Sequence, residues 1–230
     1  DDAAGLSISE KMRSQIRGLN KASDNAQDGI SLIQVAEGAL NETHSILQRM
    51  NELATQAAND TNTSVDRQSI KDEIEQLNEE LDRISSTTQF NKQDLLTGKF
   101  SGKLQVGALE GQTMDLKIST AVSSTGLKVK DIKVSTNENA GKAMKSIQDA
   151  IESVSKQRSK LGAIQNRLEH TINNLDTNAE NTQAAESRIR DTDMADEMVQ
   201  YSKNNILSQA GQSMLTQANQ QTQGVLSLLQ

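Results

Sequence analysis

The chain has 230 residues, 34% of them hydrophobic, and its 24 basic and 31 acidic side chains give a formal net charge of −7. It contains no cysteine, which excludes disulfide bonds, thiolate metal sites and a cysteine nucleophile. Basic residues form no run and aromatic residues make up only 1% of the chain, so we expect no nucleic-acid partner. No stretch approaches the roughly 18 consecutive apolar residues of a membrane-spanning helix, so we expect no membrane partner.

Proline is also absent, so nothing in the composition stops a helix from becoming very long. Apolar side chains recur at steps of three and four near the start of the chain, which predicts one helix over about residues 1–58. The main row consists of Met12, Ile16, Leu19, Ala26, Ile30, Ile33, Leu40 and Leu47. A second row consists of Ala39, Thr43, Ile46, Met50, Leu53 and Ala57. Two rows predict neighbours on more than one side, and a length of roughly 75–80 Å predicts a rod.

Four glycines, at positions 5, 18, 29 and 38, lie inside this predicted helix. Each one costs roughly 1 kcal/mol relative to alanine, so together they predict the close approach of a neighbouring backbone. Tolerated weak positions are the alternative interpretation. The sequence also opens at Asp1 in the middle of the helical pattern, so we expect a fragment that lacks its original N-terminus.

Turn-forming residues end the long helix at the run NDTNTS, residues 59–64. Either Thr63 or Ser64 then caps a second helix, which the pattern predicts to about residue 86. Its apolar positions are Ile70, Ile74, Leu77, Leu81 and Ile84. We expect the two helices to form an antiparallel hairpin.

The periodicity changes to two near residue 100, which predicts a β-hairpin region over about residues 100–136. Gly111 separates two alternating runs, as in the turn of a hairpin. The runs consist of Leu104, Val106 and Ala108, and of Met114, Leu116 and Ile118. Residues 129–134 are less regular and predict either a short strand or a loop.

Helical spacing returns over about residues 141–187 and predicts a third long helix beside the first two. The last segment, residues 188–230, is rich in Gln, Asn and Ser but carries one apolar stripe. The stripe consists of Leu207, Gly211, Met214, Ala218, Val225 and Leu228. Because such a helix cannot bury its apolar face alone, we expect a partner from outside this chain. The predicted fold class is mainly α, a long antiparallel coiled-coil helical bundle with a small β-hairpin region.

Searches for catalytic and metal-binding patterns give no convincing match. His44 and His170 each lack a second ligand at helical spacing, which argues against a metal site. Residues 24–29, DNAQDG, are similar to the start of a calcium loop, but Ala26 occupies a ligand position. Ser153 and Lys156 form an SxxK pattern without its companion motifs. We therefore predict a protein that is not an enzyme and that uses no cofactor and no metal.

Five long blocks of sequence resemble bacterial flagellin. Two are N-terminal, DDAAGLSISEKMRSQIRGL at residues 1–19 and DGISLIQVAEGALNETHSILQRMNELATQAAND at residues 28–60. Three are C-terminal, RSKLGAIQNRLEHTINNL at residues 158–175, AAESRIRDTDMADEMV at residues 184–199 and QAGQSMLTQANQQTQGVLSLLQ at residues 209–230. The blocks occur in the family's order, and the short middle region is similar to that of flagellins from Gram-positive bacilli.

The resemblance implies a structural subunit that polymerises into the bacterial flagellar filament for motility. It also implies an extracellular protein that is secreted through a type III export channel. Residues 1–187 would form the outer-core domain of the family, and residues 188–230 would form the C-terminal half of the inner-core domain. The N-terminal half of the inner core would be missing from this chain, which agrees with the apolar stripe that has no partner.

The resemblance implies one contact surface on the predicted helical hairpin. In the family this surface packs between neighbouring protofilaments, and on free subunits it binds the toll-like receptor that senses flagellin. The matching positions are Gln48, Arg49, Glu52, Leu53, Gln56 and Glu73. Arg49 and Leu53 would be the principal contacts, with the polar residues around a leucine anchor. An ordinary solvated face is the alternative interpretation.

A second contact surface is implied at the C-terminal segment. Five residues there would pack in the inner core, or would be held by a flagellar export chaperone before assembly. They are Leu207, Met214, Ala218, Val225 and Leu228. Two other functions remain as alternatives, a hook-filament junction protein of the same superfamily and a non-catalytic coiled-coil binding module.

Overall fold

The computed structural model describes residues 3–191 and 194–228, with side chains described as far as residue 220. Its contacts divide the chain into two compact units, Lys11–Gln183 and Asp1–Glu10 with Ala184–Gln230. The helices are α1 (Ala3–Ala57), α2 (Ser64–Thr87), α3 (Asn137–Arg190) and α4 (Met194–Leu228). The strands are β1 (Gln89–Phe90), β2 (Gln93–Asp94), β3 (Phe100–Gln105) and β4 (Thr113–Ile118). The predicted fold class, mainly α with long antiparallel helices and a small β-hairpin, is confirmed.

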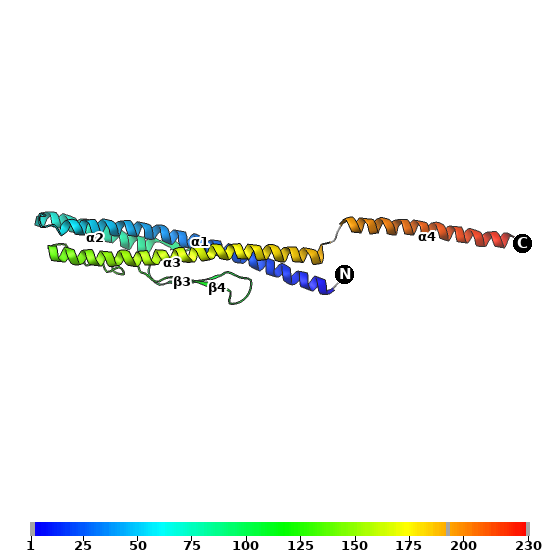
Figure 1. The fold of residues 1–230 in the computed structure, drawn as a ribbon, viewed down its shortest axis with the longest axis horizontal. Coiled ribbons are helices and arrows are strands. Elements are labelled where there is room, and N and C mark those ends of the chain that lie inside the picture. The colour runs from blue at the N-terminus through cyan, green and yellow to red at the C-terminus, as the bar shows by residue number, and fades with distance from the viewer. Residues whose placement is uncertain (1–2, 192–193, 229–230) are drawn as a thin grey trace. The chain divides into compact units, whose positions relative to one another are not determined.

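Three helices form the frame of the larger unit. Figure 1 shows α1, α2 and α3 running alongside one another, with β3 and β4 next to α3. The chain reverses between α1 and α2, and after α2 it returns to the end where α2 began before α3 starts, so that Thr55 near the end of α1 contacts Met144 near the start of α3. Farther along the same pair of helices, the Ser23 hydroxyl donates to the Asp176 carboxylate at 3.0 Å. Both helices that follow α1 therefore pack against it.

The apolar rows of these helices meet in one continuous core. Side chains with no exposed surface include Ile33, Leu40 and Leu47 of α1, Leu81 of α2, and Ile147 and Leu161 of α3. Burying one such side chain contributes roughly 1.5–3 kcal/mol. Beyond the β-hairpin, a separate and thinner cluster of Leu19, Ala22, Leu175 and Ala179 joins α1 to α3. The alternation of apolar and polar residues in β4 also has its expected effect, since Met114, Leu116 and Ile118 all face inward.

Capping residues determine where α2 begins. Thr63 is the N-cap, and it forms a capping box with Asp66. The Asp66 amide donates to the Thr63 hydroxyl at 3.3 Å, and the Thr63 amide donates to the Asp66 carboxylate at 2.8 Å. Hydrogen bonds from the Thr63 side chain and then its backbone hold the pKa of Asp66 below its usual value. Of the two caps that the sequence allows, the chain uses Thr63.

The start of α3 and the short β1–β2 pair differ from the sequence-based expectation. Helix α3 begins at Asn137, four residues earlier than predicted, because Thr136 accepts a hydrogen bond from the Asn139 amide at 3.2 Å. Strands β1 and β2 pair across Asn91 and Lys92, which have φ values of 48° and 63°. Two consecutive positive φ angles favour glycine in such a turn, so this turn lacks the usual sequence signal. Residues 129–134 form a loop and not a strand.

The glycines of α1 have different surroundings. A Cβ atom on Gly18 would lie 2.8 Å from the Cβ of Ala108 and 3.3 Å from its Cα, so the predicted close approach of backbone is confirmed there. A Cβ on Gly29 would collide with the Leu104 side chain. A Cβ on Gly38 would meet nothing within 4 Å, which fits the alternative of a tolerated weak position. No helix in the described residues is long and apolar enough to cross a membrane.

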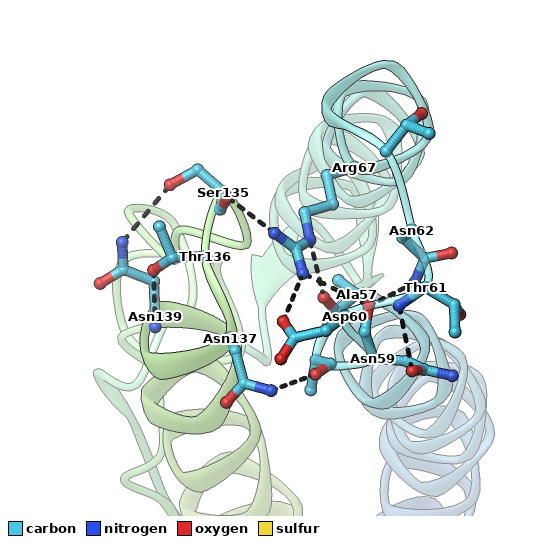
Figure 2. Close-up of polar contacts among 12 residues, drawn as sticks. Ala57, Asn59, Asp60, Thr61, Asn62, Arg67, Ser135, Thr136, Asn137 and Asn139 are labelled. Atoms are coloured by element: carbon cyan, nitrogen blue, oxygen red, sulfur yellow. Dashed lines mark hydrogen bonds and ion pairs between the residues drawn. The ribbon is translucent and has the colours of Figure 1, made fainter.

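One arginine ties three parts of the larger unit together at the end of the helical hairpin (Figure 2). The guanidinium of Arg67, on α2, donates to the carbonyl oxygens of Ala57 at 3.1 Å and Asn59 at 3.3 Å, at the end of α1. It also forms an ion pair with Asp60 at 3.2 Å and reaches the Ser135 carbonyl at 3.5 Å, just before α3. The last carbonyl groups of α1 would otherwise lack helical partners.

We expect Arg67→Ala to lower the free energy of unfolding by roughly 1–3 kcal/mol, since it removes a charged donor from several carbonyl groups at once. Only 16% of this side chain is exposed, so solvent cannot fully replace it. Chemical denaturation followed by circular dichroism measures the change. The matched control is Arg83→Ala on the same helix, because the Arg83 side chain is 62% exposed and pairs with Glu80 one turn away. An equal loss of stability in both variants would contradict this assignment.

Candidate interaction surfaces

Five polar side chains form an exposed patch across α1 and α2. We call this group the hairpin patch, and it consists of Gln48, Arg49, Glu52, Gln56 and Glu73. The first four recur at helical spacing and therefore lie on neighbouring parts of one α1 face. The antiparallel return of α2 brings Glu73, 24 residues later in the chain, against Arg49. The structure thus joins Arg49 to Glu52 and Glu73, and it places Gln48 and Gln56 on the same exposed face of α1.

Arg49 is the centre of the hairpin patch. Its Nε donates to the Glu73 carboxylate at 2.9 Å, and its Nη1 donates to the Glu52 carboxylate at 3.3 Å. The hydrogen bond that Arg49 donates to Glu73 first, and the one that it donates to Glu52 second, raise the pKa of the Arg49 guanidinium above its usual value. All three side chains are between 45% and 68% exposed, so these ion pairs contribute little to stability. Their effect is to fix the direction in which a cation and two carboxylates face the solvent.

Leu53 does not belong to the exposed patch. Its exposed fraction is 2%, and it lies in the main core. The prediction that Leu53 acts as an exposed anchor among the polar residues is therefore wrong for the isolated chain. The second apolar row of α1, to which Leu53 belongs, faces the other helices, so Leu53 supports the hairpin patch from beneath.

The C-terminal helix α4 presents the second candidate surface. Leu207 and Met214 are 58% and 68% exposed, and Ala218 is exposed as well. Val225 and Leu228 lie outside the residues whose side chains are described. Other large apolar side chains of α4 are exposed to a similar extent, and the predicted stripe did not include them. They are Met194, Met198, Val199, Tyr201, Ile206 and Leu215.

With these additional residues, the exposed apolar surface of α4 is wider than the single predicted stripe. Three adjacent pairs occur along α4, at positions 198 and 199, 206 and 207, and 214 and 215. Because neighbours in sequence are about 100° apart around a helix, each pair covers more of the circumference than one stripe does. A helix that is apolar on several sides is normally buried on several sides. The signal was present in the sequence as these pairs, which a search for a single stripe overlooks.

The SxxK residues of α3, Ser153 and Lys156, do not form a catalytic pair. The hydroxyl of Ser153 donates to the Asp149 carbonyl at 2.9 Å, and Lys156 forms an ion pair with Glu152. The structure therefore does not join Ser153 to Lys156 as a nucleophile and its base. Within the described part of the chain, no three His, Cys, Asp or Glu side chains are grouped closely enough to hold a metal ion.

Comparisons with known proteins give consistent matches along the chain. The family model of the bacterial flagellin N-terminal helical region matches residues 1–101, and that of the bacterial flagellin C-terminal helical region matches residues 144–229. The sequence is 57% identical to a flagellin of Halalkalibacterium halodurans, over 100% of this chain and 85% of that protein. It is 49% identical to the flagellar filament 31.3 kDa core protein of Treponema maltophilum, over 100% of this chain and 86% of that protein. The crystal structure of Bacillus cereus flagellin superimposes with a TM-score of 0.59 at 32% identity, over 71% of this chain and 94% of that one.

The burial of Leu53 leads to a test that separates a core residue from a surface contact. We expect Leu53→Ala to lower the free energy of unfolding by roughly 2–5 kcal/mol, because it leaves a cavity in the core. Gln56→Ala, three residues later on the exposed face, is the control and should leave the unfolding midpoint unchanged. Urea denaturation compares the two variants with the wild type. A Leu53→Ala variant as stable as the wild type would show that this side chain is not part of the core.

Proposed function

The chain belongs to the bacterial flagellin family, and on this premise we propose that it is a structural subunit of a bacterial flagellar filament. The observation that carries the proposal is the apolar surface of α4. Eight large apolar side chains there are between 56% and 68% exposed, namely Met194, Met198, Val199, Tyr201, Ile206, Leu207, Met214 and Leu215. An isolated helix with so much exposed apolar surface is not stable in water without a partner.

Copies of the same chain are partners that suit this surface. Burial of apolar surface contributes about 25 cal/mol per Å², so ordering α4 among neighbouring subunits would stabilise each contact. When a surface on one copy binds a different surface on the next and the ring does not close, the product is a helical polymer. We propose that residues 1–187 form the outer core of that polymer and residues 188–230 form the C-terminal half of its inner core. The assembled protein would be extracellular.

Before assembly, the same residues need protection from water or from premature contacts. We propose that an export chaperone covers the α4 surface at Leu207, Met214 and Ala218 while the subunit awaits secretion through a type III channel. The C-terminal positions Val225 and Leu228 continue the same stripe in the sequence. One apolar helix would thus serve two partners in turn, the chaperone and then the filament.

The hairpin patch supports a second role for the free subunit, as a ligand of the flagellin-sensing toll-like receptor. An arginine fixed by two carboxylates presents a defined pattern of charge to a partner, and arginine is frequent among the residues that dominate binding energy. Arg49 is 51% exposed, so a receptor can reach it. The same patch would be covered where subunits pack together, so only free subunits would be recognised.

We expect Leu207→Asp to reduce the rate at which subunits elongate filament fragments at least about tenfold, because assembly would bury an unpaired charge. The complete protein is added to fragments of its own filaments, and growth is measured by electron microscopy. Val65→Asp is the matched control, because Val65 is 72% exposed and an acidic residue is well tolerated in the first turn of α2.

Three results would contradict the filament proposal. They are wild-type protein that forms no filaments, short junction rings in place of long filaments, and normal elongation by Leu207→Asp. Circular dichroism of both variants checks that the free subunits keep their helices.

For the receptor role, we expect Arg49→Glu to weaken signalling by free subunits about tenfold or more, because it places a third carboxylate beside Glu52 and Glu73. The dose response of reporter cells that express the receptor measures this loss. Arg83→Glu is the control, since it changes the net charge equally and lies on α2 outside the hairpin patch. Equal potency of Arg49→Glu and the wild type would remove Arg49 from the contact surface.

A further inference from the structure

Sulfur is distributed unevenly over this chain. Its seven methionines are its only sulfur-containing residues, because cysteine is absent. Two of them are buried, Met50 with no exposed surface and Met114 with 7%. Met12 and Met144 are half-buried, and the Met144 sulfur also accepts a hydrogen bond from the Thr55 hydroxyl at 3.3 Å. The other three, Met194, Met198 and Met214, are 65%, 56% and 68% exposed, and all of them lie on α4.

We propose that these three α4 methionines are a site of reversible oxidation, and that their oxidation by peroxide prevents a free subunit from entering the filament. The inference rests on the proposed function, because it assigns the consequence to the α4 surface used in assembly. The oxidant is a peroxide such as hydrogen peroxide. The three methionines that are more than half exposed all lie on this one helix, and no thiol competes for the oxidant.

The chemistry is a two-electron oxygen transfer. The thioether sulfur attacks one oxygen of hydrogen peroxide, a sulfur–oxygen bond forms, and the oxygen–oxygen bond breaks. The second oxygen leaves as water after proton transfer, so the sulfur is oxidised to a sulfoxide and the peroxide is reduced. Methionine sulfoxide reductases reverse the change. A flexible apolar side chain thereby becomes polar, and the apolar surface of α4 becomes polar at three positions.

Burial determines which methionines react. An exposed sulfur meets the oxidant directly, whereas Met50 and Met114 react only when the core opens locally. Even if the core opens fairly easily, oxidation of a buried methionine is at least about tenfold slower than oxidation of an exposed one. In a filament the α4 methionines would react slowly too, since assembly would bury α4 and shield them from the oxidant. Oxidation would therefore act on subunits before assembly and would spare those already in place.

The effect on assembly follows from the polarity of the sulfoxide. Burying one polar group without a hydrogen-bond partner lowers an association constant roughly fivefold to a hundredfold. Met198 and Met214 are adjacent to Val199 and Leu215, so a sulfoxide at either position lies within the apolar surface. The helix itself would persist, because these side chains do not support it from a core.

The test treats the complete, free protein with dilute hydrogen peroxide and locates sulfoxides by peptide mass spectrometry. We expect Met194, Met198 and Met214 to be oxidised at least about tenfold faster than Met50 and Met114. Oxidised subunits should then elongate filament fragments at least about tenfold more slowly than untreated subunits. Treatment with methionine sulfoxide reductase should restore the rate. Equal oxidation of buried and exposed methionines, or unchanged elongation after oxidation, would overturn the inference.

A triple variant, Met194→Leu, Met198→Leu and Met214→Leu, supplies the matched control, because leucine has a similar volume and no reactive sulfur. Its elongation should resist peroxide, whereas Met12→Leu should remain as sensitive as the wild type. Loss of elongation by the peroxide-treated triple variant would place the damage elsewhere and overturn the inference. If untreated wild-type subunits fail to elongate, the proposed function fails, while the oxidation map tests the site independently. If the triple variant assembles poorly even before treatment, the reductase result on wild-type protein decides between the outcomes.

Discussion

The structure depends on burying the two apolar rows of α1, because a single helix can cover neither row by itself. One α1 side chain of the main row, Leu40, and one of the second row, Leu53, both lie in the same core. Helices α2 and α3 supply the remaining walls, and both run antiparallel to α1. The core that results is made mostly of Leu, Ile, Val, Met and Ala, which pack at the close spacing of helix seams. This core therefore extends a long way along the helices and is thin across them.

This constraint explains which features the sequence predicts well. Long repeats at steps of three and four average over many residues, so the positions of α1, α2 and α3 follow from them within a few residues. Features controlled by single hydrogen bonds are harder to predict. The first turn of α3 carries capping residues in place of an apolar stripe, and the β1–β2 turn uses Asn91 and Lys92 where glycine would have given a signal. Local geometry of this kind becomes visible only when the atoms are placed.

The hairpin patch also combines features that the sequence predicts with features that only the packing determines. Spacing along α1 places Arg49, Glu52 and Gln56 on one face, but spacing cannot say that Glu73 lies 2.9 Å from Arg49. That contact depends on the register of α2 against α1, which the Arg67 hydrogen bonds at the end of the helical hairpin help to fix. Leu53 was misplaced for the related reason that the boundary between core and surface depends on the neighbouring helices. Residue types follow from the sequence, whereas exposure follows from the packing.

Helix α4 has the same kinds of apolar side chain as α1 but the opposite burial, and this contrast connects the fold to the function. In α1 the free energy of burial is released when the chain folds, so the core stabilises the subunit whether or not it assembles. In α4 the corresponding free energy is still available in the subunit, because residues such as Ile206 and Leu207 remain more than half exposed. Under the proposed function, α4 would add to the stability of the subunit only when other copies cover it. Under the same proposal, changes to the polarity of α4 would alter assembly while the larger unit, with its own core, stays folded.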